Sequence, residues 1–514
     1  MKRTVFYSDF GAIGDGVAED FSALKRCHEY ANENSCKVCA DAGATYYIGD
    51  TDGEKIIVKT DVDFKDATFI IDDTSFPVSA KARTTHLFVL TSDYEKSILD
   101  EDSEVIKRLN AAGGIKSDAT NVGYAPGYPA MLVVIDNEHS AYNRYGTLAT
   151  GKVNPQRELV IVDAEGNIDL KTKFLLDTKH VSVIEQLRID DEPITLEGGT
   201  FITKANCAPS EYNYYSRGFC VERSNVTIKN LVHKIVGEGE TGAPYIGFII
   251  ANRINNLRCE RLTLQSHKSY KDYGPDGKFR STMGSYDIGG RMATNVCFYD
   301  CHQSNFYKDK ERGIAYDYHE YWGIMGTNYC KNLIYDKCTL SRLDAHSGVY
   351  NVVIKDTTIS FIALTGGGTA LIENSTIVSP DNSNGSLFQL RGDYGSTWKG
   401  DVIIKDCTYV NDDPNRIMLT YAIWANWDFG YKTYLPRVTL DNLKFAKPGV
   451  AYLYPILTRD KDIRMDEEVL YNGEKNLNPM KIDAPLIIKN NTAGIKYIAS
   501  ENDYVNSKIH IIEE

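Results

Sequence analysis

The stretch Ser341–Tyr350, which reads SRLDAHSGVY, places three side chains of complementary chemistry at every second position. Arg342, Asp344 and His346 alternate with apolar residues, so in a β-strand all three point to one face of the sheet. An imidazole can act as a general base, a carboxylate can orient it, and a guanidinium can bind an anionic group. This row therefore predicts acid–base chemistry on a negatively charged substrate.

Four further segments combine polar with aromatic side chains: QSHKSY, GSYDIGG and DYHEYWG before the row, and LRGDYGS after it. Exposed aromatic edges beside polar groups suit stacking against sugar rings. The alternative for each segment is ordinary packing, or a polar ladder on a solvated sheet. The catalytic candidates are His346, Asp344, Arg342, Asp287 and Tyr394, and the substrate-binding candidates are Arg391, Asp393, Tyr286, His267, Lys268, Tyr321, Trp322, His319 and Glu320.

These residues admit two enzyme chemistries, of which the first is β-elimination from an acidic polysaccharide. A lyase needs a base for the proton next to the uronate carboxyl group, a cation for the carboxylate and an acid for the leaving oxygen. His346, oriented by Asp344, would be the base, and Tyr394 would be the acid. Arg342 or Arg391 would neutralise the carboxylate. The residue types favour this chemistry.

Hydrolysis is the second chemistry, because an inverting glycosidase uses two carboxylates with room for a water between them. Asp287 and Asp344 are predicted to lie two structural repeats apart, about 9.6 Å at the usual spacing of strands in a sheet. That separation is near the upper limit for an inverting pair. An inverting glycoside hydrolase is therefore kept as the alternative.

These side chains need a repeating scaffold. A short sequence motif that recurs along the chain, called the repeated phrase below, supplies one. The phrase alternates apolar and polar residues and then places Asn, Asp or Glu before another short apolar run, which predicts a strand, a bend and a second strand. No single copy can bury its apolar side alone, so the copies must stack. They predict an all-β fold, a right-handed parallel β-helix, with one interior column formed by Val226, Leu257, Val296, Leu333, Val352, Val402 and Val438.

The spacing of the copies predicts where loops leave the stack. Leu333 and Val352 are 19 residues apart, Val352 and Ala370 are 18 apart, and the other intervals are 31 to 39 residues long. Since strand separation fixes the rise of a coil at about 4.8 Å, the excess must form loops. Loops along one edge predict a cleft over one sheet, the sheet formed by the strands that come just before each copy in the sequence. The run TGGG at Thr365–Gly368 is expected to form the floor of that cleft.

The first 50 residues carry a recognisable signature. Phe6–Leu24 reads FYSDFGAIGDGVAEDFSAL and Val38–Ile48 reads VCADAGATYYI, which resembles the opening of pectate-lyase-like β-helix proteins. Glu19, Phe21 and Ala42 stand where that opening usually has Asp, Thr and Pro. The resemblance implies a parallel β-helix with a capping helix at its open end. In this family the fold occurs in polysaccharide lyases, glycoside hydrolases and phage tail spikes.

The resemblance carries over no catalytic residue. The glycosidase branch usually has paired adjacent aspartates and Gly-His-Gly on this sheet, and the pectate lyases have calcium-binding aspartates. Neither pattern has a clear match here. A non-catalytic, tail-spike-like protein that binds glycans is therefore a third alternative. No cofactor is predicted, although a divalent cation such as calcium stays open, and a zinc site from Asp344, His346 and His319 lacks supporting spacing.

Four regions are predicted: a cap with the first coils at 1–72, a β-rich elaboration beside those coils at 73–205, regular coils carrying the site at 206–450, and a closing coil and cap at 451–514.

A net charge of −13 argues against nucleic acid as a partner, and no apolar run is long enough to span a membrane. The 11 scattered cysteines are expected to be buried thiols. With no visible signal peptide this favours the cytoplasm, or a secreted or periplasmic location if a signal was removed. The partner is expected to be an oligo- or polysaccharide, and the sequence does not indicate the oligomeric state.

Overall fold

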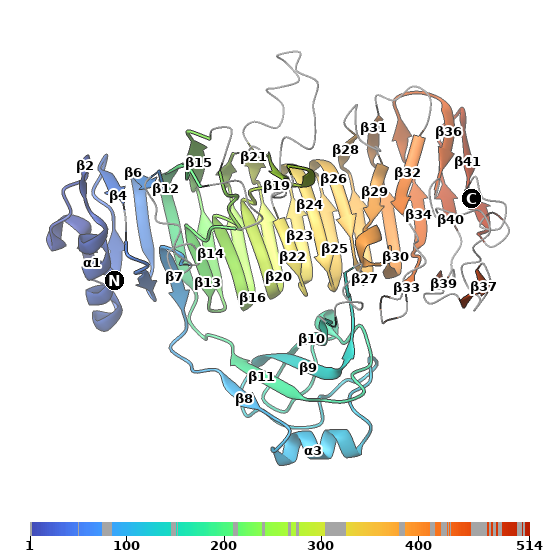
Figure 1. Cartoon of the computed structure of the whole chain (residues 1–514), viewed down its shortest axis with the longest axis horizontal. Helices are drawn as coiled ribbons and strands as arrows, with labels where there is room; N and C mark the ends of the chain where they lie inside the picture. The colour runs from blue at the N-terminus through green and yellow to red at the C-terminus, as the bar shows by residue number, and fades with distance from the viewer. Residues whose placement is uncertain are drawn as a thin grey trace. The chain divides into compact units, whose positions relative to one another are not determined.

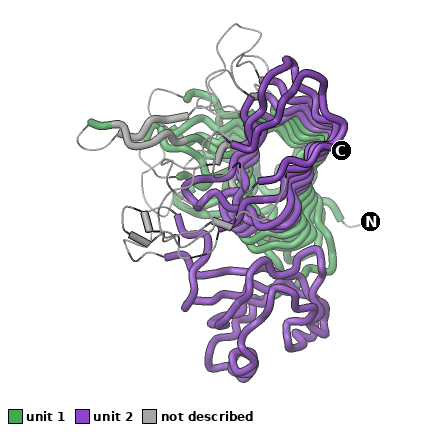
Figure 2. The backbone as a smooth tube through the Cα atoms, turned by 90° about the vertical axis from the view of Figure 1, so that its right-hand side faces the viewer, with its two compact units in different colours: residues 1–94, 189–326, 337–341 green, residues 95–188, 327–336, 342–514 purple. Residues whose placement is uncertain are grey.

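A computed structural model of the chain describes residues 3–49, 51–74, 85–144, 151, 153–208, 214–238, 242–265, 269–273, 277–303, 325–379, 386–411, 417–422, 429, 431, 433–453, 470–471, 474–475, 480–481, 486–500, 506 and 509–514. The chain forms two compact units, coloured green and purple in Figure 2. Unit 1 comprises residues 1–94, 189–326 and 337–341, and unit 2 comprises residues 95–188, 327–336 and 342–514. Among the described residues, no helix is long and apolar enough to cross a membrane.

The predicted parallel β-helix is confirmed, because strands one coil apart pair in parallel within both units. In unit 1, Val226 pairs with Leu257 and Leu257 with Val296. In unit 2 the column runs through Leu333, Val352, Ala370, Val402 and Val438, which pair in that order. These side chains are buried. Neighbours in the column lie one coil apart whether 18 or 36 residues separate them in sequence, so the longer interval does not increase the rise of the coil.

Unit 1 opens with the predicted cap. Helix α1 (Phe21–Asn34) buries Phe21, Leu24, Cys27, His28 and Ala31, the face expected from the sequence. The strands of this unit are β1 (Thr4–Phe6), β2 (Asp15–Glu19), β3 (Lys37–Cys39), β4 (Thr45–Ile48), β5 (Ile56–Val58), β6 (Val62–Asp72), β7 (Phe88–Thr91), β12 (Ile194–Lys204), β13 (Phe219–Glu222), β14 (Val226–Lys229), β15 (Val232–Val236), β16 (Ile249–Glu260), β17 (Thr263–Leu264), β20 (Ile288–Tyr299) and β21 (His302–Gln303), with an antiparallel hairpin of β18 (Ser269–Tyr273) and β19 (Phe279–Gly284).

Unit 2 contains the later coils, whose strands run side by side from β23 to β41 in Figure 1. They are β23 (Lys331–Asp336), β25 (Val349–Lys355), β26 (Thr358–Leu364), β27 (Gly366–Glu373), β28 (Thr376–Ser379), β29 (Ser386–Leu390), β30 (Trp398–Lys405), β31 (Thr408–Asn411), β32 (Ile417–Ala422), β33 (Thr433–Tyr434), β34 (Arg437–Asp441), β35 (Lys444–Phe445), β36 (Gly449–Tyr452), β37 (Leu470–Tyr471), β38 (Glu474–Lys475), β39 (Met480–Lys481), β40 (Leu486–Lys489), β41 (Ile495–Ile498) and β42 (Ile511–Glu513). Strands β22 (Met325–Asn328) and β24 (Thr339–Ser347) begin in unit 1 and end in unit 2.

The Asn and Asp residues of the repeated phrase form the bends between strands. Asn374, Asp406 and Asn442 all have φ near +50°, in the left-handed region. Asn and Asp enter that region more readily than other residues with a Cβ, since their short polar side chains can hydrogen-bond locally. Here the side chains also bond between coils, as when Asn442 Nδ2 donates to Asp406 Oδ1 at 2.7 Å. The bend predicted by the phrase is confirmed.

The cysteines are free thiols, and nine of the 11 are buried. Cys301, Cys338 and Cys407 each follow a bend residue and donate to a main-chain carbonyl. The expectation of buried thiols therefore holds, except that Cys207 is exposed and Cys297 is half-buried.

Residues 95–188 form an antiparallel lobe within unit 2. Its sheet has the order β10 (Pro155–Val162), β9 (Ala130–Ser140), β11 (Val183–Arg188), β8 (Ser97–Leu99), and helix α3 (Glu104–Ala111) accompanies it (Figure 1). The elaboration was expected beside the first coils, yet Lys331 and Lys399 of later coils hydrogen-bond to it. Lys331 Nζ lies 3.0 Å from Glu158 Oε2 in a pair that is almost wholly buried, and Lys399 Nζ donates to the carbonyl of Leu175.

The glycine run expected to be an open floor meets this lobe at Gly367. A Cβ on Gly367 would lie 2.7 Å from Leu175 Cδ1 and 2.5 Å from the carbonyl oxygen of Lys399. Thr365 is fully buried. At Gly367 the run thus admits the lobe instead of exposing a cleft, which corrects the prediction from the sequence at this position.

Candidate functional site

Strand β24 carries Arg342, Asp344 and His346, as the alternation predicted. Leu343 and Ala345, between them, are fully buried, and alternate residues of a strand point to opposite faces. The polar row, however, is not the solvated row expected from the sequence. Asp344 has no exposed surface, Arg342 is buried, and His346 is half-buried.

Asp344 is held between two guanidinium groups. Arg391 Nη1 donates to its two carboxylate oxygens at 2.8 and 2.9 Å, and Arg342 Nη2 donates to Oδ2 at 2.6 Å. Burial alone would raise the pKa of Asp344, but the charges of Arg391 and Arg342 outweigh it and hold the pKa well below its usual range. Asp344 is therefore an ionised carboxylate fixed in place by arginine.

Arg391 joins a second carboxylate to this group. Its Nε and Nη2 donate to the two oxygens of Asp393 at 3.1 and 2.9 Å. Helix η4 (Gly392–Tyr394) follows Arg391 directly and brings Asp393 into this position. Burial opposes ionisation of Asp393, yet hydrogen bonds from Arg391 lower its pKa. Both aspartates of the cluster are consequently negative at neutral pH.

Arg144 completes the cluster and was missed by the sequence analysis. Its Nε lies 3.0 Å from Asp393 Oδ2. It comes from the antiparallel lobe, 249 positions earlier in the chain than Asp393. No repeat or spacing in the sequence links these two residues. In the sequence, Arg144 is one of many charged residues near the strands of the lobe, and nothing distinguishes it from the others.

His346 and Tyr394 form the second half of the site. The imidazole Nε2 lies 2.9 Å from the Tyr394 hydroxyl, and the two rings meet edge to face at 83°. Burial lowers the pKa of His346 to about 4, although the charge of Asp344 partly opposes this. Burial also raises the pKa of Tyr394, against the influence of Arg391. At neutral pH the site therefore pairs a neutral imidazole with a protonated phenol.

One expected contact is replaced by another. Asp344 was expected to orient the imidazole of His346, but its oxygens accept hydrogen bonds from Arg342 and Arg391. In the described part of the chain, the His346 ring hydrogen-bonds to the hydroxyl of Tyr394. The reason is geometric, because the guanidinium groups of Arg342 and Arg391 occupy both oxygens of the carboxylate.

The remaining candidates are distributed as follows. Tyr286 and Asp287 belong to unit 1, where Asp287 is fully buried and accepts a hydrogen bond from Gln303 Nε2 at 2.9 Å, and Tyr286 stacks on Tyr214 at 6.2 Å between ring centroids. His267, Lys268, His319, Glu320, Tyr321 and Trp322 lie outside the described residues. Within the described ranges, no three His, Cys, Asp or Glu side chains are grouped so as to hold a metal ion.

No protein-family model and no curated protein sequence matches this chain. Among solved structures it is similar to a tailspike of Pseudomonas phage phi297, with 11% identity over 99% of this chain and 84% of that chain and a TM-score of 0.43. It is also similar to the gp54 tailspike of Acinetobacter baumannii bacteriophage AP22 in complex with a capsular saccharide, with 10% identity, coverage of 97% and 77%, and a TM-score of 0.44. A third is a family 28 exopolygalacturonase of Yersinia enterocolitica, with 12% identity, coverage of 96% and 79%, and a TM-score of 0.30. The saccharide and the enzymatic activity belong to those proteins.

Proposed function

We propose that this chain cleaves a uronate-containing polysaccharide by β-elimination, with His346 as the base and Tyr394 as the acid. The observation that carries the proposal is the 2.9 Å contact between the neutral imidazole and the protonated phenol. A lyase needs these two protonation states at the start of each turnover, one group to take a proton and the other to give one. The contact keeps the base, His346, and the acid, Tyr394, within hydrogen-bonding distance of each other.

The charge of the cluster supports an anionic substrate. Arg144, Arg342 and Arg391 carry three positive charges and Asp344 and Asp393 carry two negative ones, so the group has one net positive charge. The whole chain carries −13. A locally positive site on a negative protein attracts a negative sugar specifically to that place.

The reaction can be written with atoms and electrons balanced. His346 Nε2 takes the proton from C5 of the uronate, the C5–H electron pair forms the C4–C5 double bond, and the C4–O4 bond breaks. Tyr394 donates its hydroxyl proton to O4, which leaves as the hydroxyl of the departing chain. The proton on His346 then passes to the Tyr394 oxygen across their 2.9 Å contact, which restores both groups without a further reagent.

The paired-carboxylate hydrolase is less well supported by this cluster. An inverting hydrolase needs one protonated carboxyl group, whose pKa is raised, and one free carboxylate. The pKa of Asp344 and that of Asp393 are both lowered by arginine. Asp344 also has no exposed surface with which to meet a sugar or a water.

The test is the chemistry of the products. The chain is incubated with polygalacturonate, alginate and hyaluronate in water enriched in ¹⁸O, and the new chain ends are analysed by mass. The lyase predicts an unsaturated uronate end and no ¹⁸O in either product. Saturated ends carrying ¹⁸O would move the assignment to a hydrolase, and binding without any new chain end would favour a glycan-binding protein.

A further inference from the structure

Arg144 is the most exposed arginine of the cluster. Half of its side chain, 52%, is accessible, against 15% for Arg391 and 10% for Arg342. Its Nε approaches Asp393 Oδ2, the oxygen that also accepts a hydrogen bond from Arg391 Nη2. Arg391 already makes two hydrogen bonds to Asp393. A ligand carboxylate could therefore take the place of Asp393 as the partner of Arg144, and Asp393 would still be paired with Arg391.

The main chain leading to Arg144 is held in place by residues that follow the site strands. Asn143 is fully buried, and its Nδ2 donates to the carbonyl of Phe429 at 2.9 Å while its Oδ1 accepts from the Asn154 N–H at 2.7 Å. The ring of Tyr142 packs at 5.3 Å from that of Tyr431, whose hydroxyl donates to the Tyr394 carbonyl. Arg144 is thus presented by a fixed backbone beside the catalytic tyrosine.

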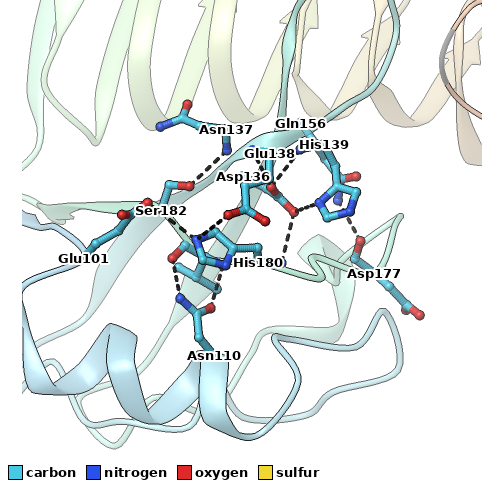
Figure 3. A network of polar contacts seen from close by, with 11 residues as sticks. Glu101, Asn110, Asp136, Asn137, Glu138, His139, Gln156, Asp177, His180 and Ser182 are labelled. Atoms are coloured by element: carbon cyan, nitrogen blue, oxygen red, sulfur yellow. Dashed lines mark hydrogen bonds and ion pairs between the residues drawn. The ribbon is translucent and has the colours of Figure 1, made fainter.

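The end of strand β9, from which this backbone departs, is fixed by a buried carboxylate (Figure 3). Asp136 has no exposed surface, and its oxygens accept hydrogen bonds from the main-chain N–H groups of Glu138, His139 and His180. Nδ1 of the His139 ring adds a hydrogen bond with Asp136 Oδ2 at 2.9 Å. A functional group on a rigid, hydrogen-bonded support loses little freedom on binding, which favours affinity.

The charge of Arg144 acts on both reacting groups. Burial is the main influence on the pKa of His346 and of Tyr394, and the positive charge of Arg144 lowers both pKa values. In a hexuronate the acidic C5–H lies on the carbon next to the carboxylate carbon. A cation that binds the carboxylate must therefore lie near the base, and Arg144 pairs with Asp393, the residue before Tyr394, whose hydroxyl contacts the base.

We propose that Arg144, supplied by the antiparallel lobe, binds the carboxylate of the reacting sugar and so makes the site select a uronate over a neutral sugar. This inference rests on the function proposed above and adds the residue that determines specificity. It replaces the earlier assignment of that role to Arg342 or Arg391, whose guanidinium groups are committed to Asp344.

The experiment compares initial rates on the polyuronate that the wild-type chain cleaves with rates on the same polymer after its carboxyl groups are reduced. Arg144→Ala is expected to raise KM on the acidic polymer about 10- to 100-fold, as for the loss of hydrogen bonds to a charged group. Arg144→Lys should restore part of this, since lysine keeps the charge but cannot form a two-pronged contact. The matched control is Arg108→Ala, which removes an exposed arginine from helix α3 of the same lobe and should leave KM unchanged.

The outcomes separate this inference from the proposed function. A wild-type chain that produces no unsaturated ends from any polyuronate contradicts the proposed function, and this inference with it. If the wild-type chain is active and Arg144→Ala keeps its KM on the acidic polymer, the role of Arg144 is wrong while the function stands. An equal loss on the carboxyl-reduced polymer would also overturn it, because the effect would then not depend on the carboxylate. Thermal unfolding of each variant shows that the fold is retained.

Discussion

Arg391 and Asp344, 47 positions apart in sequence, meet through two hydrogen bonds from Nη1 to both carboxylate oxygens, at 2.8 and 2.9 Å. The same guanidinium uses Nε and Nη2 to hold Asp393. One arginine therefore links β24 to the segment after β29, and its donors are directed at two protein carboxylates. We therefore infer a supporting role for Arg391, and its contact with substrate stays a prediction from the sequence.

Asp344→Asn is expected to destabilise the fold as well as the site. Asp344 is buried between two arginines, and removing one partner of a buried ion pair typically costs about 3–5 kcal/mol. The free energy of unfolding in urea measures this. Asp401→Asn is the control, because its pair with Arg437 is partly exposed and should contribute no more than about 1 kcal/mol. Equal losses in both variants would contradict the supporting role of Asp344.

His346→Gln is expected to reduce kcat by about 10²- to 10⁴-fold with the fold intact, because a general base is removed while a polar side chain of similar length remains. Initial rates on the preferred polyuronate measure it, with His510→Gln, an exposed histidine, as control. A His346→Gln variant of near-normal activity would show that another group is the base.

Tyr394→Phe is expected to lower kcat with little change in KM, since the hydroxyl proton is transferred only as the C4–O4 bond breaks. Its ring packing against His346 is preserved in phenylalanine. The measurement is kcat and KM on the same polymer. A large rise in KM with unchanged kcat would instead make Tyr394 a binding residue.

The pH dependence of activity follows from the pKa of His346, which burial lowers to about 4. The base is active when neutral, so kcat/KM is expected to stay level at neutral pH and to fall as the pH drops through about 4. The pKa of Tyr394 is raised, so no alkaline loss from this acid is expected below its usual range. A profile of kcat/KM against pH tests both limbs, and an acid limb centred near 6.5 would show an imidazole that burial does not affect.

The free energy of unfolding, like kcat/KM, is expected to decrease as the pH falls. The pKa of His346 is about 4 in the folded chain and near 6.5 when unfolded, so between these values the unfolded chain binds the extra proton. The stabilisation is complete above pH 6.5 and is lost as the pH falls toward 4, by at most about 3 kcal/mol. Thermal unfolding of His346→Gln against wild type isolates this group from His28 and His86, whose pKa values burial also lowers. If the difference in stability between His346→Gln and wild type stays constant between pH 6.5 and 4, the prediction is contradicted.

Gly367→Ala is expected to destabilise unit 2 by about 1–3 kcal/mol, the usual cost of overpacking, because its Cβ would meet Leu175 and the Lys399 carbonyl. Gly449→Ala is the control, since the nearest atom to its Cβ is Ile417 Cδ1 at 3.4 Å. Urea unfolding and limited proteolysis of the lobe measure the effect. A Gly367→Ala chain as stable as wild type would show that the lobe does not depend on this contact.

The sequence by itself determined the scaffold. Period-two alternation, the Asn and Asp bends and the stacking of copies follow from local backbone preferences and from the need to bury one face of each strand, and both can be read from neighbouring residues. The interior column and the face of α1 were predicted for the same reason. The row Arg342, Asp344 and His346 was found because alternation along one strand is also a local property.

The partners of that row were decided by tertiary structure alone. Whether Asp344 pairs with His346 or with Arg391 depends on which side chains adjacent coils bring together, and loops of variable length set that register. Arg144 enters through an antiparallel lobe in which Glu158 pairs with Lys331 and Leu175 lies against Gly367. Burial then sets the pKa of His346, and burial depends on every element packed around the ring, which no short stretch of sequence contains.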